Sequence, residues 1–338
     1  MIVSSLRTKI GSPLCRSAGV IAAAAVVLIA LFFSALFFSL GRTETARTVR
    51  IVVPIAAGGF GDTLSRLLAE EISGAQGLTV LVEDRPGAGT ALGTEAVARA
   101  APDGNTLLFT APAFVINPLL RKLSYDPLTS FEPVCYLARA PMVIAVNSAS
   151  RFHTLADLID AARAHPGGLT VAASSGSLLQ IVFEQLKRAA SVDITFVPYP
   201  GNTPAVSALL GGHVTSIIVT YSDAAAQIET GKLRALATAS AQRIELAPQL
   251  PTFAEAGYPS IDAEGWFGLV APAKTPTRVV SQLAGWFSTA LRTPKIKTKL
   301  REQGNLAVGT CGAPFAAFLH KQYDEYGHVI RESKMQAE

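Results

Sequence analysis

The chain is poor in charge for its length. Charged residues make up 16% of its 338 residues, and the formal net charge is +4. Most of that excess lies near the N-terminus, where Arg7, Lys9, Arg16 and Arg42 outnumber one acid, Glu44. The remainder is close to neutral, so it lacks the basic surface that nucleic-acid binding requires. We therefore expect no nucleic-acid partner.

Motifs for cofactors and metals are also missing. The sequence has no phosphate-binding G-x-x-x-x-G-K-[ST] loop. Gly87, Gly89 and Gly93 have the spacing G-x-G-x-x-x-G, which is one residue longer than the dinucleotide fingerprint. The five histidines are His153, His165, His213, His320 and His328. No two of them have the sequence spacing of metal ligands. We expect no cofactor and no metal.

Catalysis has no positive support either. The chain lacks the G-x-S-x-G turn that presents a nucleophilic serine. An exported enzyme that uses Ser177 or Asp62 is the alternative, but the sequence identifies no base for either residue. The prediction is that the protein is not an enzyme.

Cysteine is scarce, with three in the chain. Cys15 precedes the long apolar run at residues 18–40, so it is not placed like a lipid-modified cysteine. Cys135 and Cys311 are interpreted as two unpaired buried thiols. An exported protein can also pair them, and the sequence does not show whether they lie close together.

The N-terminus has the pattern of an export signal. Basic residues precede the uncharged apolar run from Ala18 to Leu40. Cleavage after Gly41 is the favoured interpretation, and a retained membrane anchor is the alternative, because the run is long enough to span a bilayer. Either way residues 1–46 form a separate segment and the rest of the chain is exported, since positive charge before the run keeps the N-terminus cytoplasmic.

The stretch from Val49 to Ser73 predicts a strand, a glycine turn and a helix. Residues 49–53 suit a buried parallel strand, and Pro54 ends it. Three glycines at 58, 59 and 61 allow a tight turn, and Asp62 is expected to cap the helix. A helix N-terminus with free N–H groups suits a carboxylate or phosphate. The alternative is a tight turn that binds nothing.

The same pattern recurs along the chain. A strand at 169–173 leads into Ser174, Ser175, Gly176 and Ser177, and a helix follows to about Ala190. Strands alternate with helices throughout, which predicts α/β architecture with mainly parallel sheets. Ligands bind at the carboxyl ends of strands in such sheets, so Thr110 and Asn117 after the strand at 106–110 are candidates.

Short motifs in order along the chain resemble the tripartite tricarboxylate transporter receptors, the Bug or TctC-type periplasmic solute-binding proteins. The motifs are Arg50–Pro54 with Ala57-Gly58-Gly59 and Asp62, Glu83–Gly89, Ala101–Gly104, Tyr125–Pro127, Val197–Tyr199, Leu209–Gly212, Gly231–Ala237, Leu250–Thr252, Glu255–Gly257 and Trp266–Pro272.

The resemblance implies a two-domain periplasmic-binding-protein fold of type II, the Venus-flytrap arrangement, with a ligand cleft between the lobes. Residues 47–146 and 271–338 are expected to form lobe 1, and residues 147–270 lobe 2. The implied protein is a periplasmic monomer that captures a small organic acid and works with membrane subunits of a tripartite transporter. A ligand sensor for a signalling partner is the alternative.

The resemblance also implies which residues contact the ligand. They lie in the loops after the strands of each lobe, and they are Ile55, Ala57, Gly58, Gly59, Phe60, Asp62, Thr110 and Asn117 in lobe 1 and Ser174, Ser175, Gly176, Ser177, Tyr199, Asn202, Thr220 and Asp223 in lobe 2. Phe60 stands where the family has a small residue, and the run Ser177–Ile181 is about two residues shorter than in the family. These departures predict a more apolar pocket that prefers a monocarboxylate or aromatic acid to citrate.

Overall fold

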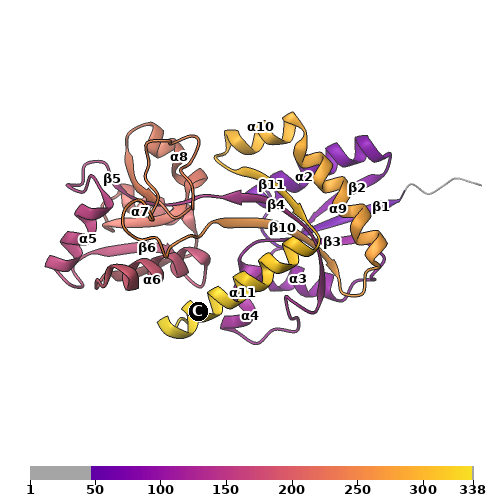
Figure 1. Ribbon diagram of the computed structural model, residues 1–338, viewed down its shortest axis with the longest axis horizontal. Coiled ribbons are helices and arrows are strands. Elements are labelled where there is room, and N and C mark those ends of the chain that lie inside the picture. The colour runs from indigo at the N-terminus through magenta and orange to yellow at the C-terminus, as the bar shows by residue number, and fades with distance from the viewer. Residues whose placement is uncertain (1–46, 337–338) are drawn as a thin grey trace, which may run out of the picture. The chain divides into compact units, whose positions relative to one another are not determined.

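The computed structural model describes residues 47–336 (Figure 1). The predicted signal or anchor at 1–46 lies outside the described residues. Residues from Arg47 onward form one compact unit. Within 47–336, every helix is too short or too polar to cross a bilayer.

Within residues 47–336, eleven strands and their helices build two α/β parts. The first elements are β1 (Thr48–Val53), α2 (Phe60–Gln76), β2 (Thr79–Asp84), the 3-10 turn η1 (Ala88–Thr90), α3 (Ala91–Ala98), β3 (Thr106–Thr110), α4 (Ala113–Leu120) and β4 (Phe131–Ala140). The middle of the chain forms β5 (Met142–Asn147), α5 (Leu155–Ala164), β6 (Thr170–Ser174), α6 (Leu178–Ala190), β7 (Thr195–Tyr199), α7 (Asn202–Leu210), β8 (Ser216–Thr220), α8 (Tyr221–Glu229) and β9 (Leu233–Thr238). The last elements are β10 (Gly265–Pro272), α9 (Thr277–Arg292), α10 (Pro294–Glu302), β11 (Leu306–Cys311) and α11 (Ala313–Ser333).

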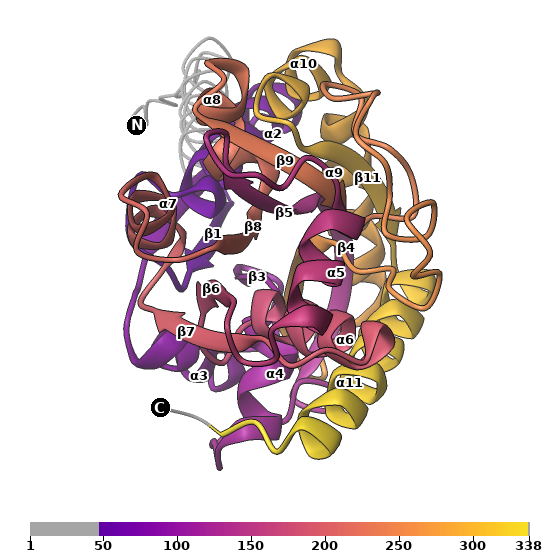
Figure 2. The same cartoon turned by 90° about the vertical axis from the view of Figure 1, so that its left-hand side faces the viewer.

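The strands form two sheets. A six-stranded sheet has the order β11-β4-β10-β3-β1-β2, and a five-stranded sheet has the order β7-β6-β8-β5-β9. We call the part built on the first sheet lobe 1 and the part built on the second lobe 2. Helices α5 to α8 surround the second sheet (Figure 2). In each lobe three parallel strands stand side by side, β2-β1-β3 and β7-β6-β8.

The predicted α/β fold class is confirmed, but each sheet is mixed rather than mainly parallel. β10 runs antiparallel to β3 and β4, β11 runs antiparallel to β4, and β5 runs antiparallel to β8 and β9. From β5 to β9 strands and helices alternate without a break, although β5 runs antiparallel to β8 and β9, so the alternation does not by itself fix strand direction. The strands near the two crossings between the sheets add the antiparallel half.

The chain crosses between the sheets twice, after β4 and before β10. Strand β5 pairs with β8 and β9, so the first crossing falls at Pro141 rather than after residue 146. Strand β10 pairs along its whole length with lobe 1, so the second crossing precedes Gly265 rather than residue 271. The predicted lobe boundaries at 146/147 and 270/271 therefore both move toward the N-terminus. The prediction that residues 1–46 form a separate segment stays a prediction.

Each lobe buries the helix that follows its first parallel strand. In lobe 1, Ile51 and Val53 of β1 pack in one cluster with Leu64 and Leu68 of α2. A second cluster joins the lobes, because it contains Trp266 of β10, residues of α11 and the buried face of α6. Helix α11 packs on both α4 and α6, so it contacts both lobes.

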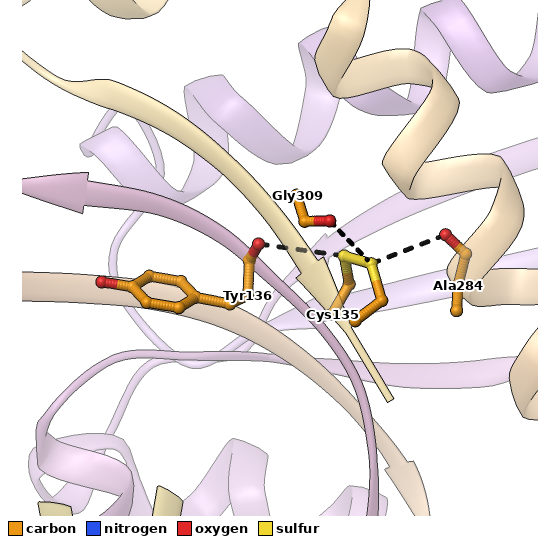
Figure 3. The surroundings of a disulfide bond; sticks show 5 residues. Cys135, Tyr136, Ala284 and Gly309 are labelled. Atoms are coloured by element: carbon orange, nitrogen blue, oxygen red, sulfur yellow. Dashed lines mark hydrogen bonds between the residues drawn. A yellow bond between two sulfur atoms is a disulfide. The ribbon is translucent and has the colours of Figure 1, made fainter. Parts of the chain in front are cut away.

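A disulfide joins Cys135 of β4 to Cys311 of β11. The two residues face each other in the antiparallel register of these strands. Sγ of Cys311 lies 3.5 Å from the carbonyl oxygen of Gly309 and 3.7 Å from that of Ala284 (Figure 3). The interpretation as unpaired thiols is wrong, because strand β11, which brings Cys311 beside β4, was not among the predicted strands.

Candidate functional site

The first loop runs from Ile55 to Gly59, between β1 and α2. Gly58 has a φ of +81°, which favours glycine. The N-cap of α2 is Gly59, and Asp62 is the third residue of the helix, so the prediction that Asp62 is the cap is wrong. Asp62 instead reaches back, and its Oδ2 accepts a hydrogen bond from the Gly58 amide at 2.8 Å. The carboxylate closes the loop.

Asp62 is buried, and its charge is paired. Nε of Arg66 lies 2.5 Å from Oδ1 of Asp62, and Nη2 of Arg66 lies 2.9 Å from Oδ2 of Asp84. One guanidinium therefore serves two carboxylates beneath the first loop, which leaves this group of three with a net negative charge.

The side chains of the first loop are apolar. The Phe60 ring packs on Phe267 with centroids 4.4 Å apart, and Phe267 stacks on Phe109 at 5.7 Å. A Cβ at Gly61 would lie 2.6 Å from Cε1 of Phe109 and 2.8 Å from Cδ1 of Ile55, so only glycine fits there. Ala57 and Gly58 are exposed at the tip of the loop, and Gly59 is partly exposed.

Thr110 lies at the end of β3, one strand from the first loop. Its hydroxyl is buried and has no hydrogen-bond partner among residues 47–336. Thr110 shares a cavity of about 20 Å³ with Ile55 and Thr90. A space of this size holds one water molecule. The structure thus brings Thr110 and the first loop together.

Asn117 holds a neighbouring turn, and its predicted contact with a ligand stays a prediction. Its Nδ2 donates to the carbonyl of Gly89 at 2.5 Å and to Oγ1 of Thr90 at 3.3 Å. Nη2 of Arg121 also donates to the carbonyl of Ala88. Four consecutive residues from Gly87 to Thr90 have positive φ, so this turn is strained and these two side chains hold it in place. Sequence reasoning rejected the glycines of this turn as a cofactor motif and counted Glu83–Gly89 among the family motifs, but it did not link the turn to Asn117.

The second loop, Ser174–Ser177, repeats the geometry of the first. Gly176 has a φ of +62°, and its amide donates to Oε1 of Gln180 at 2.8 Å. Gln180 is the third residue of α6, as Asp62 is the third residue of α2. Oγ of Ser177 donates to the carbonyl of Ser174 at 2.6 Å. Ser175 lies partly exposed between them.

Sequence reasoning missed Gln180 as a site residue. The signal was present, because Ser177 and Gln180 have the S-x-x-Q spacing that marks a helix start. The observed bonds differ from that motif, since Gln180 accepts from the residue before the N-cap and the Ser177 hydroxyl donates to a carbonyl.

The other predicted residues of lobe 2 lie beside the second loop. Ser174 pairs with Tyr199 in the parallel register of β6 and β7. Thr220 ends the neighbouring strand β8 and is the N-cap of α8. Nδ2 of Asn202 donates to Oδ2 of Asp223 at 2.5 Å, so the loops after β7 and β8 are joined. Burial raises the pKa of Tyr221, which follows Thr220, so its hydroxyl stays neutral.

Helix α4 connects the two loops. A Cβ at Gly176 would lie 3.5 Å from Cδ1 of Leu120 at the end of α4. The same helix carries Asn117, which holds the turn that shares the Thr110 cavity. The second loop of lobe 2 therefore lies against lobe 1.

Cavities of much larger volume lie elsewhere. One of about 710 Å³ is lined by Leu155, Arg234 and Leu250 within lobe 2. Another of about 730 Å³ lies between Arg188 of α6 and Glu332 of α11. The predicted site residues line neither, so cavity volume does not identify the site.

The chemistry of the two loops is that of binding by amides and hydroxyls. The first amides of a helix have no intrahelical partner and favour an anion. Neither loop contains a lysine, arginine or histidine. Among residues 47–336, Ser177 hydrogen-bonds a carbonyl and no histidine, so the arrangement of a serine with its base is not formed there.

Comparison with known proteins gives consistent matches. The family model described as "Tripartite tricarboxylate transporter family receptor" matches residues 64–335. The Bordetella pertussis protein BugT is 32% identical over 295 residues, covering 86% of this chain and 90% of BugT. The structure of the periplasmic binding protein BugD is 31% identical, covers 86% of this chain and 99% of that chain, and has a TM-score of 0.73. The structure of R. palustris Rpa4515 with adipate is 31% identical and has a TM-score of 0.76. The match covers 86% of this chain and 98% of that chain.

Proposed function

The chain belongs to the tripartite tricarboxylate transporter receptor family and has its periplasmic-binding-protein fold, and from this premise we propose that it captures a small organic carboxylate between its two lobes. The family consists of solute-binding receptors, so the general role is binding rather than catalysis. The structure of a relative with adipate supports a carboxylate as the ligand class.

The observation that carries the proposal is the repeated loop. In each lobe a glycine with positive φ precedes a helix. The side chain of the third residue of that helix accepts a hydrogen bond from the backbone amide of this glycine. The closed loop keeps the following amides in a fixed direction. Charge-assisted hydrogen bonds from fixed amides can hold a carboxylate without a lysine or arginine. The contact residues are those predicted in both loops, with Gln180 added and Asn117 acting through the Gly87–Thr90 turn.

The place and the partners follow from the family. We propose that the protein acts in the periplasm and presents its ligand to membrane subunits of a tripartite transporter. Closure of the two lobes around the ligand would give the membrane subunits a ligand-bound conformation to recognise.

A thermal-shift panel of carboxylates tests the proposal. Residues 47–338 form a compact unit and are the sample. A ligand that binds only the folded state stabilises it by mass action and so raises the melting temperature. At a free ligand concentration of a hundred times Kd, the gain in the free energy of unfolding is about 2.7 kcal/mol. We expect at least one small carboxylate to raise it, and the ligand to be recovered unchanged. A panel of organic acids, amino acids and amides without any shift would contradict the proposal, and turnover of the bound acid would favour the enzyme alternative.

A further inference from the structure

The two loops share one geometry but differ in charge. In lobe 1 the closing side chain is the carboxylate of Asp62, which lies with Asp84 around one guanidinium. In lobe 2 the closing side chain is the neutral carboxamide of Gln180. The nearest charged residues along α6 are Glu184, Lys187 and Arg188, which begin one turn further on. An anion therefore meets net negative charge directly behind the first loop, whereas the side chain that closes the second loop is neutral. The neighbouring loop after β8 carries one acid, Asp223, whose carboxylate accepts a hydrogen bond from Nδ2 of Asn202.

The carboxamide also offers a donor that a carboxylate lacks. The Gly176 amide can only donate, so the group that faces it must be the oxygen of Gln180, and Nε2 points away from that bond. Among residues 47–336 no acceptor is found for Nε2, and the side chain is partly exposed. In lobe 1 the corresponding atom is Oδ1 of Asp62, which faces Arg66.

The side chains of the two loops also differ in polarity, and lobe 2 again offers the better surroundings for a carboxylate. Lobe 1 presents Ile55 and the Phe60 ring, which packs on Phe267. Lobe 2 presents the hydroxyl-bearing residues Ser174, Ser175 and Ser177, all partly exposed. An apolar part of a ligand is stabilised when it leaves water and packs on the apolar side chains of lobe 1. A carboxylate next to the serines of lobe 2 keeps hydrogen bonds that replace those it made with water.

We propose that Gln180 fixes the orientation and the class of the ligand. One carboxylate lies on the Ser174–Ser177 loop and accepts a hydrogen bond from Nε2 of Gln180. The uncharged body of the ligand lies toward Ile55 and Phe60 of lobe 1. The ligand is therefore a monocarboxylate with an apolar body rather than a dicarboxylate. This inference rests on the proposed function, because it needs a carboxylate in the cleft.

The first experiment compares acids that differ in one carboxylate. Calorimetric titration of residues 47–338 uses three pairs of probes: butanoate and succinate, hexanoate and adipate, benzoate and terephthalate. We expect the monocarboxylate to bind at least tenfold more tightly in the pair that contains the tightest ligand. A dicarboxylate that binds more tightly than its partner would overturn the monocarboxylate class. If none of the six binds while another carboxylate of the thermal-shift panel does, the same comparison is made between that acid and its analogue with one carboxylate more or fewer, and the proposed function stands whichever of the two binds more tightly.

The second experiment tests Gln180 itself. Gln180→Glu keeps an oxygen for the Gly176 amide but replaces the Nε2 donor with an acceptor. The probes are the tightest acid of the panel and its primary amide, which can donate. We expect Gln180→Glu to weaken the acid at least tenfold and to weaken the amide less, so that the preference moves toward the amide. Gln242→Glu makes the same charge change at an exposed position outside both loops and should change either affinity less than twofold.

The outcomes separate the two claims. If the wild type binds a carboxylate and Gln180→Glu changes acid and amide by the same factor, Gln180 does not contact the ligand head and the inference is overturned, while the proposed function stands. A loss of folding is recognised by the melting temperature without ligand. In that case Gln180→Met, which removes both polar atoms and adds no charge, replaces it: a loss of acid affinity of less than threefold would overturn the inference.

Discussion

In lobe 1 the loop after β1 is closed by a carboxylate, and in lobe 2 the loop after β6 is closed by a carboxamide. The backbone problem is the same in both, because a positive-φ glycine before a helix leaves an amide that needs an acceptor. The two side chains differ in charge: in lobe 1 Arg66 pairs with the buried carboxylate of Asp62, whereas Gln180 in lobe 2 is neutral and needs no cation. The same fold can therefore repeat a loop and still give its two sides different charge.

The lobes also differ in cross-links, since the disulfide lies wholly in lobe 1. The largest expected effect in the molecule is its loss. Replacing Cys135 and Cys311 together with serine should lower the free energy of unfolding by about 2–4 kcal/mol, because the closed loop constrains the unfolded chain. Urea unfolding of residues 47–338 measures it, and reductant on the wild type is the matched control.

That experiment also tests whether the lobes unfold together. Both tryptophans, Trp266 and Trp286, lie in lobe 1, so their fluorescence follows that lobe, whereas far-ultraviolet circular dichroism follows both. Trp266 shares a buried cluster with Ile181 of α6, so we expect the two signals to move together. A fluorescence midpoint that falls while the dichroism midpoint stays would show that the lobes are independent.

The disulfide shows where sequence reasoning stops. The loops at Gly58 and Gly176 were predictable, because strand, glycine and helix follow each other within a few residues. The pairing of Cys135 with Cys311 spans 176 residues and depends on β11, whose short run Leu306–Cys311 contains Gly309 and carries little strand signal. Contacts of that separation are set by the sheet order, which local patterns do not contain.

The candidate site shows the same limit. Residue types and spacing indicated which loops matter, but they did not indicate where each side chain points. Asn117 was expected to face a ligand, and the sequence did not indicate that its Nδ2 also holds Gly89 and Thr90. Asp62 was expected to cap its helix, and it reaches one residue further back. Such choices depend on which acceptor is nearest in the folded chain.

The second prediction compares the two closing side chains. Asp62→Ala removes a buried carboxylate that accepts from the Gly58 amide and pairs with Arg66. Because hydrogen bonds to a charged group are stronger than neutral ones, the change should cost about 1–3 kcal/mol. Gln180→Ala removes one neutral bond at a partly exposed place, and it should cost about 1 kcal/mol or less. Urea unfolding gives both values, and Asp62→Asn, which keeps an acceptor oxygen, separates the hydrogen bond from the charge. Equal costs for the two alanine variants would mean that the charge in lobe 1 has no effect on stability.

The third prediction sets two hydroxyls against each other. Thr110 in lobe 1 has a buried hydroxyl without a partner, and Ser177 in lobe 2 has one that donates at 2.6 Å. Thr110→Val should therefore stabilise the protein, and Ser177→Ala should destabilise it, each by about 1 kcal/mol. Melting temperatures measured without ligand check the signs. A destabilised Thr110→Val protein would show that a water in the small cavity satisfies the hydroxyl.

The smallest effect concerns pH and belongs to lobe 2. Burial raises the pKa of Glu184 on α6, while the positive charges of Lys187 and Arg188 lower it in part. A carboxyl with a raised pKa in the folded state binds its proton more tightly when folded. Its contribution to stability is complete below the ordinary value near 4.5 and is lost as the pH rises through the folded value.

Glu184→Gln should therefore flatten the fall in stability as the pH rises above this range. Glu332, which pairs with Arg188 from α11, faces the same region and is left unchanged in this variant. Urea midpoints from pH 4 to pH 8, at intervals of roughly one unit, bracket the ordinary glutamate value. The matched control is Glu302→Gln on an exposed stretch of α10 in lobe 1, which should keep the wild-type profile. If both variants change the profile alike, the effect comes from net charge, and burial of Glu184 is not its cause.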